Sequence, residues 1–277
     1  MPSSDAQWGR IEPLLPDRTP RRGGRWRDHR EVIDAIVFKF QTGSQWVHLP
    51  EKYGNWRGVY NRLRMWAVDG TWERVFTALM ARADADEDLT WAVSVDSTIV
   101  RAHQHAAGAR RKGGSPAGEP HDHAIGRSRG GLTKKIHLAA DDRCRPMAFV
   151  LTPGQAGDAP AFTQVMARLR VPRPRGRPRT RPDVVLADKA YSSRAIRDHP
   201  RRRGIRAVIP IPADQRGHRL RRRSRGGRPP ALDRDAYKQL NTVEPCINRL
   251  KQWRGLATRY DKTATIYLAG IFIWSAR

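Results

Sequence analysis

The sequence predicts a two-part protein: a small all-α domain over residues 1–87, and an α/β domain with a mixed sheet flanked by helices over residues 88–277. Apolar residues recur at helical spacing through the first part. After Asp88 the pattern changes to short apolar runs, which are typical of strands and alternate with amphipathic segments. This alternation indicates a layered α/β domain, and a hairpin among the strands makes the sheet mixed.

Four short helices are expected in the first part. Ser4 or Asp5 caps the first helix, Pro16 closes it, and the others cover about 28–40, 56–68 and 72–79. The third helix has an apolar face and a basic face that carries Arg57, Arg62 and Arg64. A helix-turn-helix DNA reader has this form, and a plain helical bundle is the open alternative, because no feature identifies a helix that enters a groove.

The second part contains five expected strands and three expected helices. The strands cover residues 91–95, 136–140, 147–151, 184–187 and 207–209, and the second and third form a hairpin. The helices cover about 160–169, 192–203 and 235–253. Three basic stretches without apolar periodicity are expected to be loops, at 106–131, 170–182 and 215–230.

Charge is the strongest compositional signal. The chain has 53 Lys and Arg against 27 Asp and Glu, a formal net charge of +26. A polyanionic partner such as DNA explains this excess better than solubility alone. A membrane is excluded as the partner because the sequence has no long apolar span. For the stretches at 170–182 and 215–230, contact with the DNA backbone is favoured over merely solvated charge.

Several other classes of site find little support. Cys144 and Cys246 have no Cys-x-x-Cys partner, which argues against a disulfide scaffold or a cysteine-rich zinc site. Five histidines invite a zinc interpretation, but their spacing matches no standard motif: His103, His105, His121, His123 and His137. The first residues show no signal-peptide pattern, so a cytoplasmic, nucleoid-associated protein is expected.

Three acidic residues are the candidates for chemistry. Asp96 directly follows the expected strand 91–95, and Asp188 directly follows the strand 184–187. Ligands gather at strand ends in open α/β sheets, and paired carboxylates suit Mg²⁺, although an aspartate after a strand is also an ordinary turn residue. On the last expected helix, Tyr237, Glu244 and Lys251 are spaced seven residues apart along one edge. A solvated helix flank is the alternative interpretation of that edge.

Three segments of the sequence resemble the DDE transposases of bacterial insertion sequences of the insertion-sequence-five type. Val95-Asp96-Ser97-Thr98 with Arg101-Ala102-His103 resembles the first catalytic segment, and Leu186-Ala187-Asp188-Lys189-Ala190-Tyr191 resembles the second. Tyr237, Glu244 and Lys251 match the third. The intervening Gly126–Gly131 and Lys135-Ile136-His137, and the N-terminal Trp8 and Trp72–Val75, are also similar to the family.

The resemblance implies an RNase H-like fold and a reaction. Asp96, Asp188 and Glu244 would be the catalytic residues and would hold two Mg²⁺ or Mn²⁺ ions, one activating the attacking water or DNA 3′-hydroxyl and one stabilising the leaving oxygen. The partner would be double-stranded DNA, as terminal inverted repeats and as target, bound by a homo-oligomer. Lys251 and Arg254 would contact the phosphate backbone.

Two residues of the third segment depart from the family. Leu240 stands where the family has Arg, and Pro245 directly follows Glu244. Within a helix, Pro245 would cost about 3 kcal/mol and displace Glu244. The hypothesis is that this copy is impaired, and that restoring Arg at 240 and replacing Pro245 raises strand cleavage. The alternatives are a catalytically dead DNA-binding remnant of a transposase and a nuclease without strand transfer. An RNA-binding protein is the least favoured alternative because no RNA-binding signature is visible.

Overall fold

The computed structural model describes residues 3–17, 26–108, 119–238 and 243–276. Its N-terminal part consists of four α-helices joined by turns and short 3-10 helices, as predicted: α1 (Asp5–Ile11), α2 (His29–Thr42), α3 (Trp56–Val68) and α4 (Thr71–Ala85). The side chain of Ser4 caps α1 and that of Asn55 caps α3. Gly43 ends α2 with a φ of 70°, a left-handed conformation that glycine adopts without strain.

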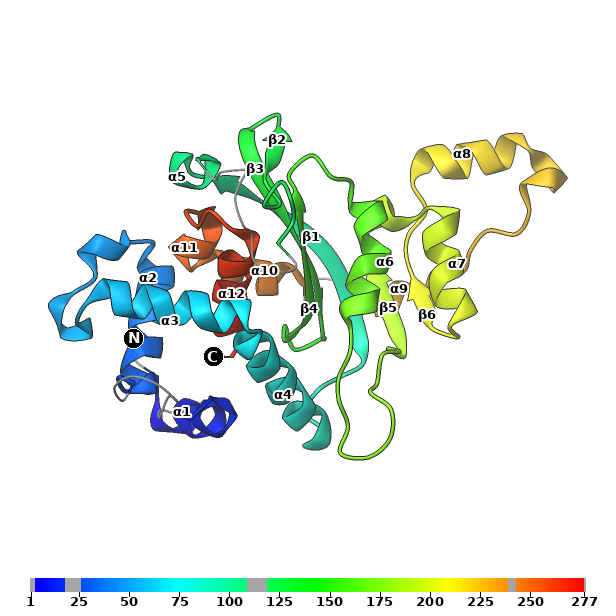
Figure 1. Ribbon diagram of the computed structural model, residues 1–277. Coiled ribbons are helices and arrows are strands. Elements are labelled where there is room, and N and C mark those ends of the chain that lie inside the picture. Colours follow the sequence, from blue (N-terminus) through cyan, green and yellow to red (C-terminus); the bar gives the residue numbers. More distant parts are fainter. Residues whose placement is uncertain (1–2, 18–25, 109–118, 239–242, 277) are drawn as a thin grey trace.

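A seven-stranded mixed sheet forms the centre of the molecule (Figure 1). Its main order is β4-β3-β1-β5-β6; the first three strands pair antiparallel, and β1, β5 and β6 pair parallel. Two short strands complete it, with β2 beside β3 and β7 beside β1. The strands are β1 (Ala92–Ala102), β2 (Gly126–Ser128), β3 (Gly131–Ala140), β4 (Pro146–Pro153), β5 (Val184–Ala187), β6 (Arg206–Val208) and β7 (Thr258–Arg259). This order and these directions make the sheet RNase H-like, as expected.

β1 is longer than its apolar run predicted. The expected strand ended at Val95, but β1 continues to Ala102 because β3 pairs with it from Ser94 to Arg101. Asp96 therefore lies within a strand, and the prediction that it follows a strand end is wrong. Residues 96–102 do not form a continuous apolar run, because alternate residues of a strand face opposite sides of the sheet and some of them are polar. A search for apolar runs therefore does not detect this part of β1.

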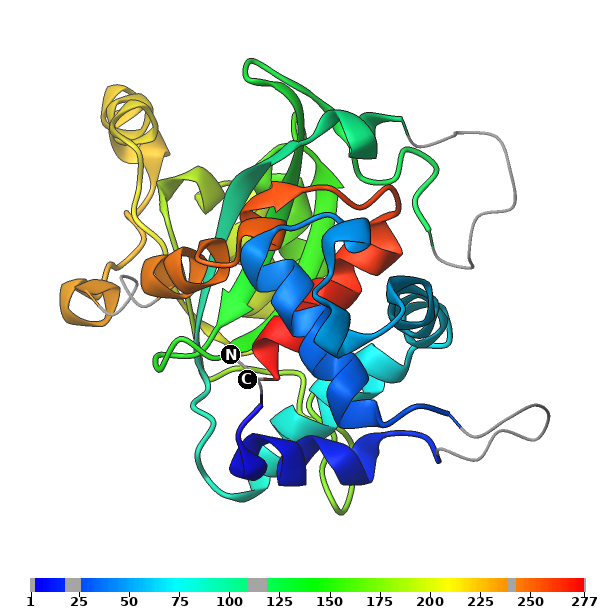
Figure 2. The same cartoon turned by 90° about the vertical axis from the view of Figure 1, so that its left-hand side faces the viewer.

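Helices cover both faces of the sheet. On one face lie α6 (Asp158–Arg168) and α7 (Arg194–Arg202), with the short 3-10 helix η4 (Lys189–Tyr191) after β5. On the other face lie α10 (Val243–Lys251), α11 (Arg254–Ala257) and α12 (Ala264–Ser275), together with the N-terminal helices (Figures 1 and 2). α12 is buried among α2, α3, α4 and β4, so one hydrophobic core runs through both parts of the chain.

Close packing fixes α12 against α2. A Cβ atom built on Gly270 of α12 would lie 2.5 Å from Cε1 of Phe40, whose side chain is fully buried. Only a glycine allows this approach.

Among the described residues, no helix is long and apolar enough to cross a bilayer.

Three predicted segments differ from the structure. The stretch 215–230, expected to be a loop, contains α8 (Ala213–Arg221) and the 3-10 helix η5 (Arg223–Gly226). The helix expected over 235–253 ends at Lys251, and its described parts are α9 (Arg234–Lys238) and α10 (Val243–Lys251), with residues 239–242 outside the described part. The expected loop 106–131 is flanked by α5 (Gln104–Ala107) and includes β2, and its residues 109–118 lie outside the described part.

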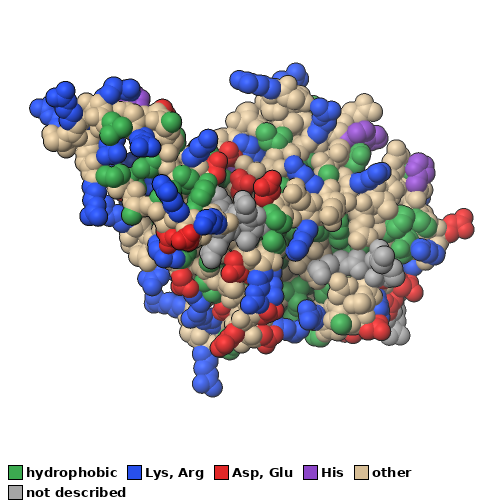
Figure 3. Space-filling view, turned by 180° about the vertical axis from the view of Figure 1, so that it is seen from behind, with side chains coloured by type: hydrophobic (Ala, Val, Ile, Leu, Met, Phe, Trp, Pro, Cys, Tyr) green, Lys and Arg blue, Asp and Glu red, His purple; other side chains and the backbone are tan. Residues whose placement is uncertain are grey.

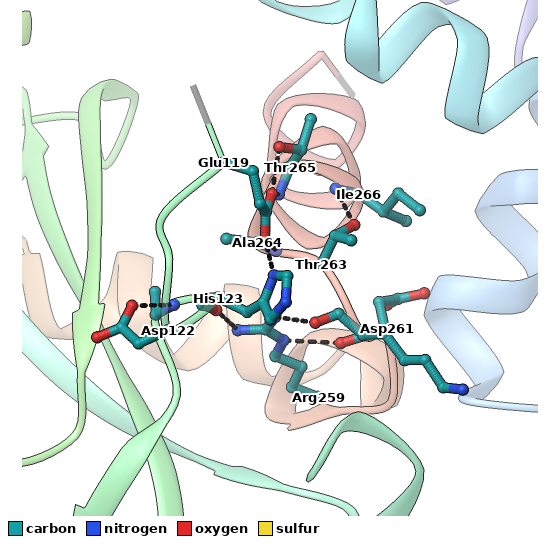
Figure 4. Close-up of polar contacts among 11 residues, drawn as sticks. Glu119, Asp122, His123, Arg259, Asp261, Thr263, Ala264, Thr265 and Ile266 are labelled. Carbon is teal, nitrogen blue, oxygen red and sulfur yellow. Dashed lines mark hydrogen bonds and ion pairs between the residues drawn. The ribbon is translucent and has the colours of Figure 1, made fainter. Parts of the chain in front are cut away.

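A buried polar network anchors the segment between β7 and α12 (Figure 4). The Arg259 guanidinium, fully buried, donates to the carbonyl oxygens of His123 (2.6 Å), Asp261 (2.8 Å) and Lys262 (2.8 Å). The Glu119 carboxylate accepts from the Ala264 amide at 2.6 Å and so satisfies a free amide at the start of α12. This network joins the end of the sheet to the central helix of the core.

Candidate active site

Asp96 and Asp188 are neighbours in the sheet. Val95 and Ala187 are register partners in the parallel pair β1–β5. Asp96 directly follows Val95, and Asp188 directly follows Ala187. Adjacent strands lie about 4.8 Å apart, which sets the scale of the separation between the two backbones. β5 ends at Ala187, while β7 meets β1 only at Arg101, so the edge of β1 beside Asp96 is open between these pairings in the described structure.

Local hydrogen bonds orient both carboxylates. Asp96 Oδ1 accepts from the Ser97 amide at 2.7 Å, and Asp188 Oδ1 accepts from the Ala190 amide at 2.5 Å as the cap of η4. Both side chains are half-buried. Each keeps a second oxygen for another ligand.

Glu244 reaches the same region from the other end of the chain. It is the second residue of α10, is exposed, and α10 packs against β1 and β3. Burial raises the pKa of Asp96, the Ser97 amide lowers it, and the negative charges of Asp188, Asp158 and Glu244 raise it further. Asp96 therefore lies within electrostatic range of both other predicted catalytic residues.

The donor set fits a divalent cation in chemistry. Carboxylate oxygens are the ligands that Mg²⁺ prefers, and a cation would offset the mutual repulsion that raises the pKa of Asp96. Asp96 and Asp188 are placed for this by the register of the sheet. In the described parts of the chain, however, no three Asp, Glu, His or Cys side chains are grouped closely enough to hold a metal ion together. Joint binding by Asp96, Asp188 and Glu244 stays a prediction.

Sequence reasoning missed a polar cluster beside Asp96. Asp158, the first residue of α6, accepts a hydrogen bond from Ser97 Oγ at 2.5 Å and one from Lys135 Nζ at 3.0 Å. Tyr191 is buried next to this cluster, and burial raises the pKa of its hydroxyl, as do the charges of Asp158, Asp96 and Asp188. Ser97 and Lys135 lie in segments that resemble the transposase family, whereas no motif or pattern indicated Asp158.

The predicted DNA-contacting residues divide into exposed and buried ones. Lys251 and Arg254 are exposed at the end of α10 and the start of α11, and Arg57 and Arg64 are exposed on α3. Tyr237 on α9 is half-buried, and burial and then the charge of Asp188 raise its pKa, so it lies near Asp188.

The expectation of a common arginine face on α3 is wrong for Arg62. Its side chain is only 9% exposed, and its guanidinium carbon lies 4.1 Å from the ring centroid of Trp26 and 5.2 Å from that of Trp66. Arg62 Nη1 also lies 3.0 Å from His29 Nδ1. Arg62 therefore packs inside the helical part, because stacking on indole rings compensates for the burial of its charge.

The predicted cost of Pro245 depends on its position in the helix. In the described structure it is the third residue of α10 (Val243–Lys251), and residues 239–242 before it lie outside the described part. The first-turn amides of a helix have no intrahelical acceptor, so a proline there loses no backbone hydrogen bond. The other departure, Leu240, lies outside the described residues.

The segment that contains α8 projects from the body of the protein (Figure 1). Between residues 213 and 230 the sequence has seven arginines and one acidic residue, Asp214. In Figure 3 basic side chains cover the corresponding projection at the upper left. We call residues 213–230 the basic arm. It leads through α9 to the helix that carries Glu244.

The strand order, with aspartates on the first strand and after a neighbouring parallel strand, places the second part of the chain in the RNase H-like fold class. A family model described as a transposase DDE domain matches residues 88–274. The chain belongs to this family. A second model, described as a putative transposase of the IS4/5 family, matches residues 4–76.

Similar proteins come from bacterial genomes. The chain is 41% identical over 111 residues to the uncharacterised protein y4sN of Sinorhizobium fredii, covering 40% of this chain and 85% of that protein. It is 36% identical over 105 residues to a 16.2 kDa protein of insertion element IS402 of Burkholderia cepacia, covering 35% and 71%. It is 27% identical over 151 residues to a putative transposase for insertion sequence element IS6501 of Brucella ovis, covering 52% and 98%.

A solved structure of the Mos1 transposase paired-end complex with left transposon end is similar at 15% identity, with a TM-score of 0.26, over 86% of this chain and 83% of that one. The fold assignment rests on the strand order of the sheet, not on this distant likeness.

Proposed function

We propose that this protein is a transposase that cleaves DNA strands at the ends of an insertion sequence and transfers them into target DNA. The observation that carries the proposal is the placement of Asp96 and Asp188 after register partners in β1 and β5, with Glu244 close enough to perturb Asp96. Family membership supplies the class of reaction.

Asp96, Asp188 and Glu244 would hold two Mg²⁺ or Mn²⁺ ions, which supply charge stabilisation and activation of the attacking oxygen in phosphoryl transfer. The chain itself contributes orientation. The Ser97 and Ala190 amides fix one oxygen of each aspartate and leave the other for a ligand. Basic side chains near the site would offset the negative charge that builds on the phosphate.

The DNA partner would lie along the basic surfaces. We place Lys251 and Arg254 beside the cleaved strand because they follow Glu244 on α10 and α11 and are exposed. Tyr237, the basic arm, Arg57 and Arg64 are further contacts in this proposal. Residues 1–87 would form the DNA-binding domain and residues 88–277 the catalytic domain, acting in a homo-oligomer on terminal repeats and target DNA in the bacterial cytoplasm.

A second candidate is a DNA-binding remnant without catalysis. One observation favours it: the described residues contain no three-residue group that could hold a metal. A remnant would keep the basic surfaces and lose only the chemistry.

One experiment separates these candidates. Purified protein is incubated with Mg²⁺ or Mn²⁺ and a DNA fragment that carries the repeats flanking its own gene, alongside an Asp96→Ala variant. The proposal expects metal-dependent nicks at the fragment ends, and joined products with a target duplication, from the unaltered protein only. Binding without nicking supports the remnant, and nicking without joined products indicates a nuclease.

A further inference from the structure

We propose that Asp158 is a positioning residue for Asp96, acting through Ser97 and held in place by Lys135. The inference rests on the proposed metal-binding role of Asp96. Asp158 lies 62 residues beyond Asp96 in the chain, at the start of α6, and meets β1 and β3 there. Nothing in the family comparison or in the sequence pattern assigns it a role.

Ser97 links the two carboxylates. Its amide donates to Asp96 Oδ1 at 2.7 Å, and its hydroxyl donates to Asp158 Oδ1 at 2.5 Å. The side chain of Ser97 faces the opposite side of the sheet from that of Asp96, because side chains alternate along β1. Asp158 therefore restrains Asp96 through the backbone of β1 and does not share its face. A fixed Ser97 amide holds the Asp96 carboxylate in one orientation.

Lys135 holds the Asp158 carboxylate in place. Its ammonium is nearly buried and donates to the Asp158 carboxylate at 3.0 Å and to the Ala156 carbonyl oxygen at 2.8 Å. It thereby ties the turn before α6 to β3. Burial would raise the pKa of Asp158, but the hydrogen bonds from Ser97 and Lys135 outweigh it and lower the pKa, so the carboxylate is charged at neutral pH.

His137 completes the surroundings without competing for Asp158. It is the register partner of Ser97 on β3, and its Nδ1 lies 3.8 Å from Asp158 Oδ1. Burial lowers the pKa of His137 to about 4, so its ring is neutral at pH 7. Its Nε2 lies 2.8 Å from Thr152 Oγ1. Lys135 is thus the cation that balances Asp158 within this cluster.

In this arrangement Asp158, Ser97 and Lys135 hold a proposed metal ligand in place without contacting the metal themselves. Groups that hydrogen-bond to ligating side chains set their orientation, and their loss typically weakens metal affinity about 10–100-fold. We expect Asp158→Asn and Ser97→Ala each to weaken Mn²⁺ binding by at least about 10-fold. Ser97→Thr keeps the hydroxyl on a strand position and should restore affinity close to that of the unaltered protein.

The test measures Mn²⁺ affinity of the full chain by electron paramagnetic resonance of free Mn²⁺, together with thermal unfolding. Asp198→Asn, which removes a carboxylate on α7 whose side chain is 40% exposed, is the matched control. Asp96→Asn tests the metal site itself. Loss of Mn²⁺ binding in Asp96→Asn with unchanged affinity in Asp158→Asn or Ser97→Ala would overturn the positioning inference alone. Unchanged affinity in Asp96→Asn would instead overturn the metal site. If Ser97→Ala does not fold, Asp158→Asn still decides the matter.

Discussion

A buried ion pair joins the two parts of the chain. Lys39 on α2 and Asp261, just after β7, have side chains 2% and 4% exposed, and their closest N···O distance is 3.3 Å. The Lys39 ammonium also lies 4.2 Å from the ring centroid of Phe40. The pair therefore connects the N-terminal helices with the DDE domain through a dry contact.

Removing one partner should be costly. At 3.3 Å and an effective dielectric constant of about 20, two unit charges attract by about 5 kcal/mol. Part of this gain offsets the desolvation of both ions, and breaking one buried pair typically costs about 3–5 kcal/mol because a charge is left uncompensated. We expect Asp261→Asn to lower the free energy of unfolding by about 3 kcal/mol, a fall in melting temperature of about 6–12 °C.

Urea unfolding followed by circular dichroism measures this loss, in a double-mutant cycle with Lys39→Met. Because the double variant removes both charges of this pair, it should regain about 2 kcal/mol relative to the sum of the single variants. Glu73→Gln is the control: Glu73 and Arg168 join the same two parts of the chain at 3.5 Å, but both are more than half exposed. This control should change stability by under about 1 kcal/mol. Equal effects of Asp261→Asn and Glu73→Gln, or strict additivity in the cycle, would refute the reasoning.

Three further predictions concern other sites. Burial, and then the charge of Arg259, lowers the pKa of Lys134 in the folded protein well below 10.5. At pH values between this lowered pKa and 10.5, Lys134 is protonated in the unfolded chain but not in the folded one. The free energy of unfolding should therefore rise with pH in this range. Lys134→Met should remove that rise. If the urea midpoint of Lys134→Met had the same dependence on pH as that of the unaltered protein, the prediction would be contradicted. Pro245→Ala should change the free energy of unfolding by under about 1 kcal/mol, whereas a gain near 3 kcal/mol would show a strained helix interior. Three exposed arginines of the basic arm, Arg216, Arg222 and Arg225, can be replaced together by glutamine. This should reduce the slope of log K against log salt for DNA binding by up to about 2.7, with Arg168→Gln as the single-site control. An unchanged slope would show that the arm does not contact DNA.

Local sequence patterns predicted most helices and strands well. The third helix was expected over 56–68 and covers Trp56–Val68, and the strand expected over 184–187 covers Val184–Ala187. The helix has apolar residues at helical spacing after an Asn cap, and the strand is a continuous apolar run between two aspartates. The mixed sheet and its hairpin between β3 and β4 were also confirmed. The single helices and strands depend on residues close together in the chain, which a pattern can express, whereas the mixed sheet was inferred from the order of its elements.

The errors have a common physical cause, which is contact between segments far apart in the chain. Arg62 lay on the predicted basic face of its helix, and only the packing of Trp26 and Trp66 around it explains its burial. Likewise, pairing with β3 extends β1 beyond its apolar run. For the candidate site, the family segments indicated Asp96 and Asp188, whereas Asp158 becomes visible only when α6 is folded onto the sheet.

The two kinds of charge in this protein require opposite partners. Burial and the charges of Asp188, Asp158 and Glu244 raise the pKa of Asp96, so the proposed metal site would favour a bound cation, while the chain as a whole carries +26 and favours a polyanion. A DNA phosphate beside Asp96 would supply further oxygen ligands for the cation, and the cation would offset repulsion between the phosphate and the carboxylates. By linkage, each ligand must then raise the affinity for the other by the same factor. In the proposed transposase the cation would therefore bind most tightly when DNA is present, and phosphoryl transfer would be confined to the complex.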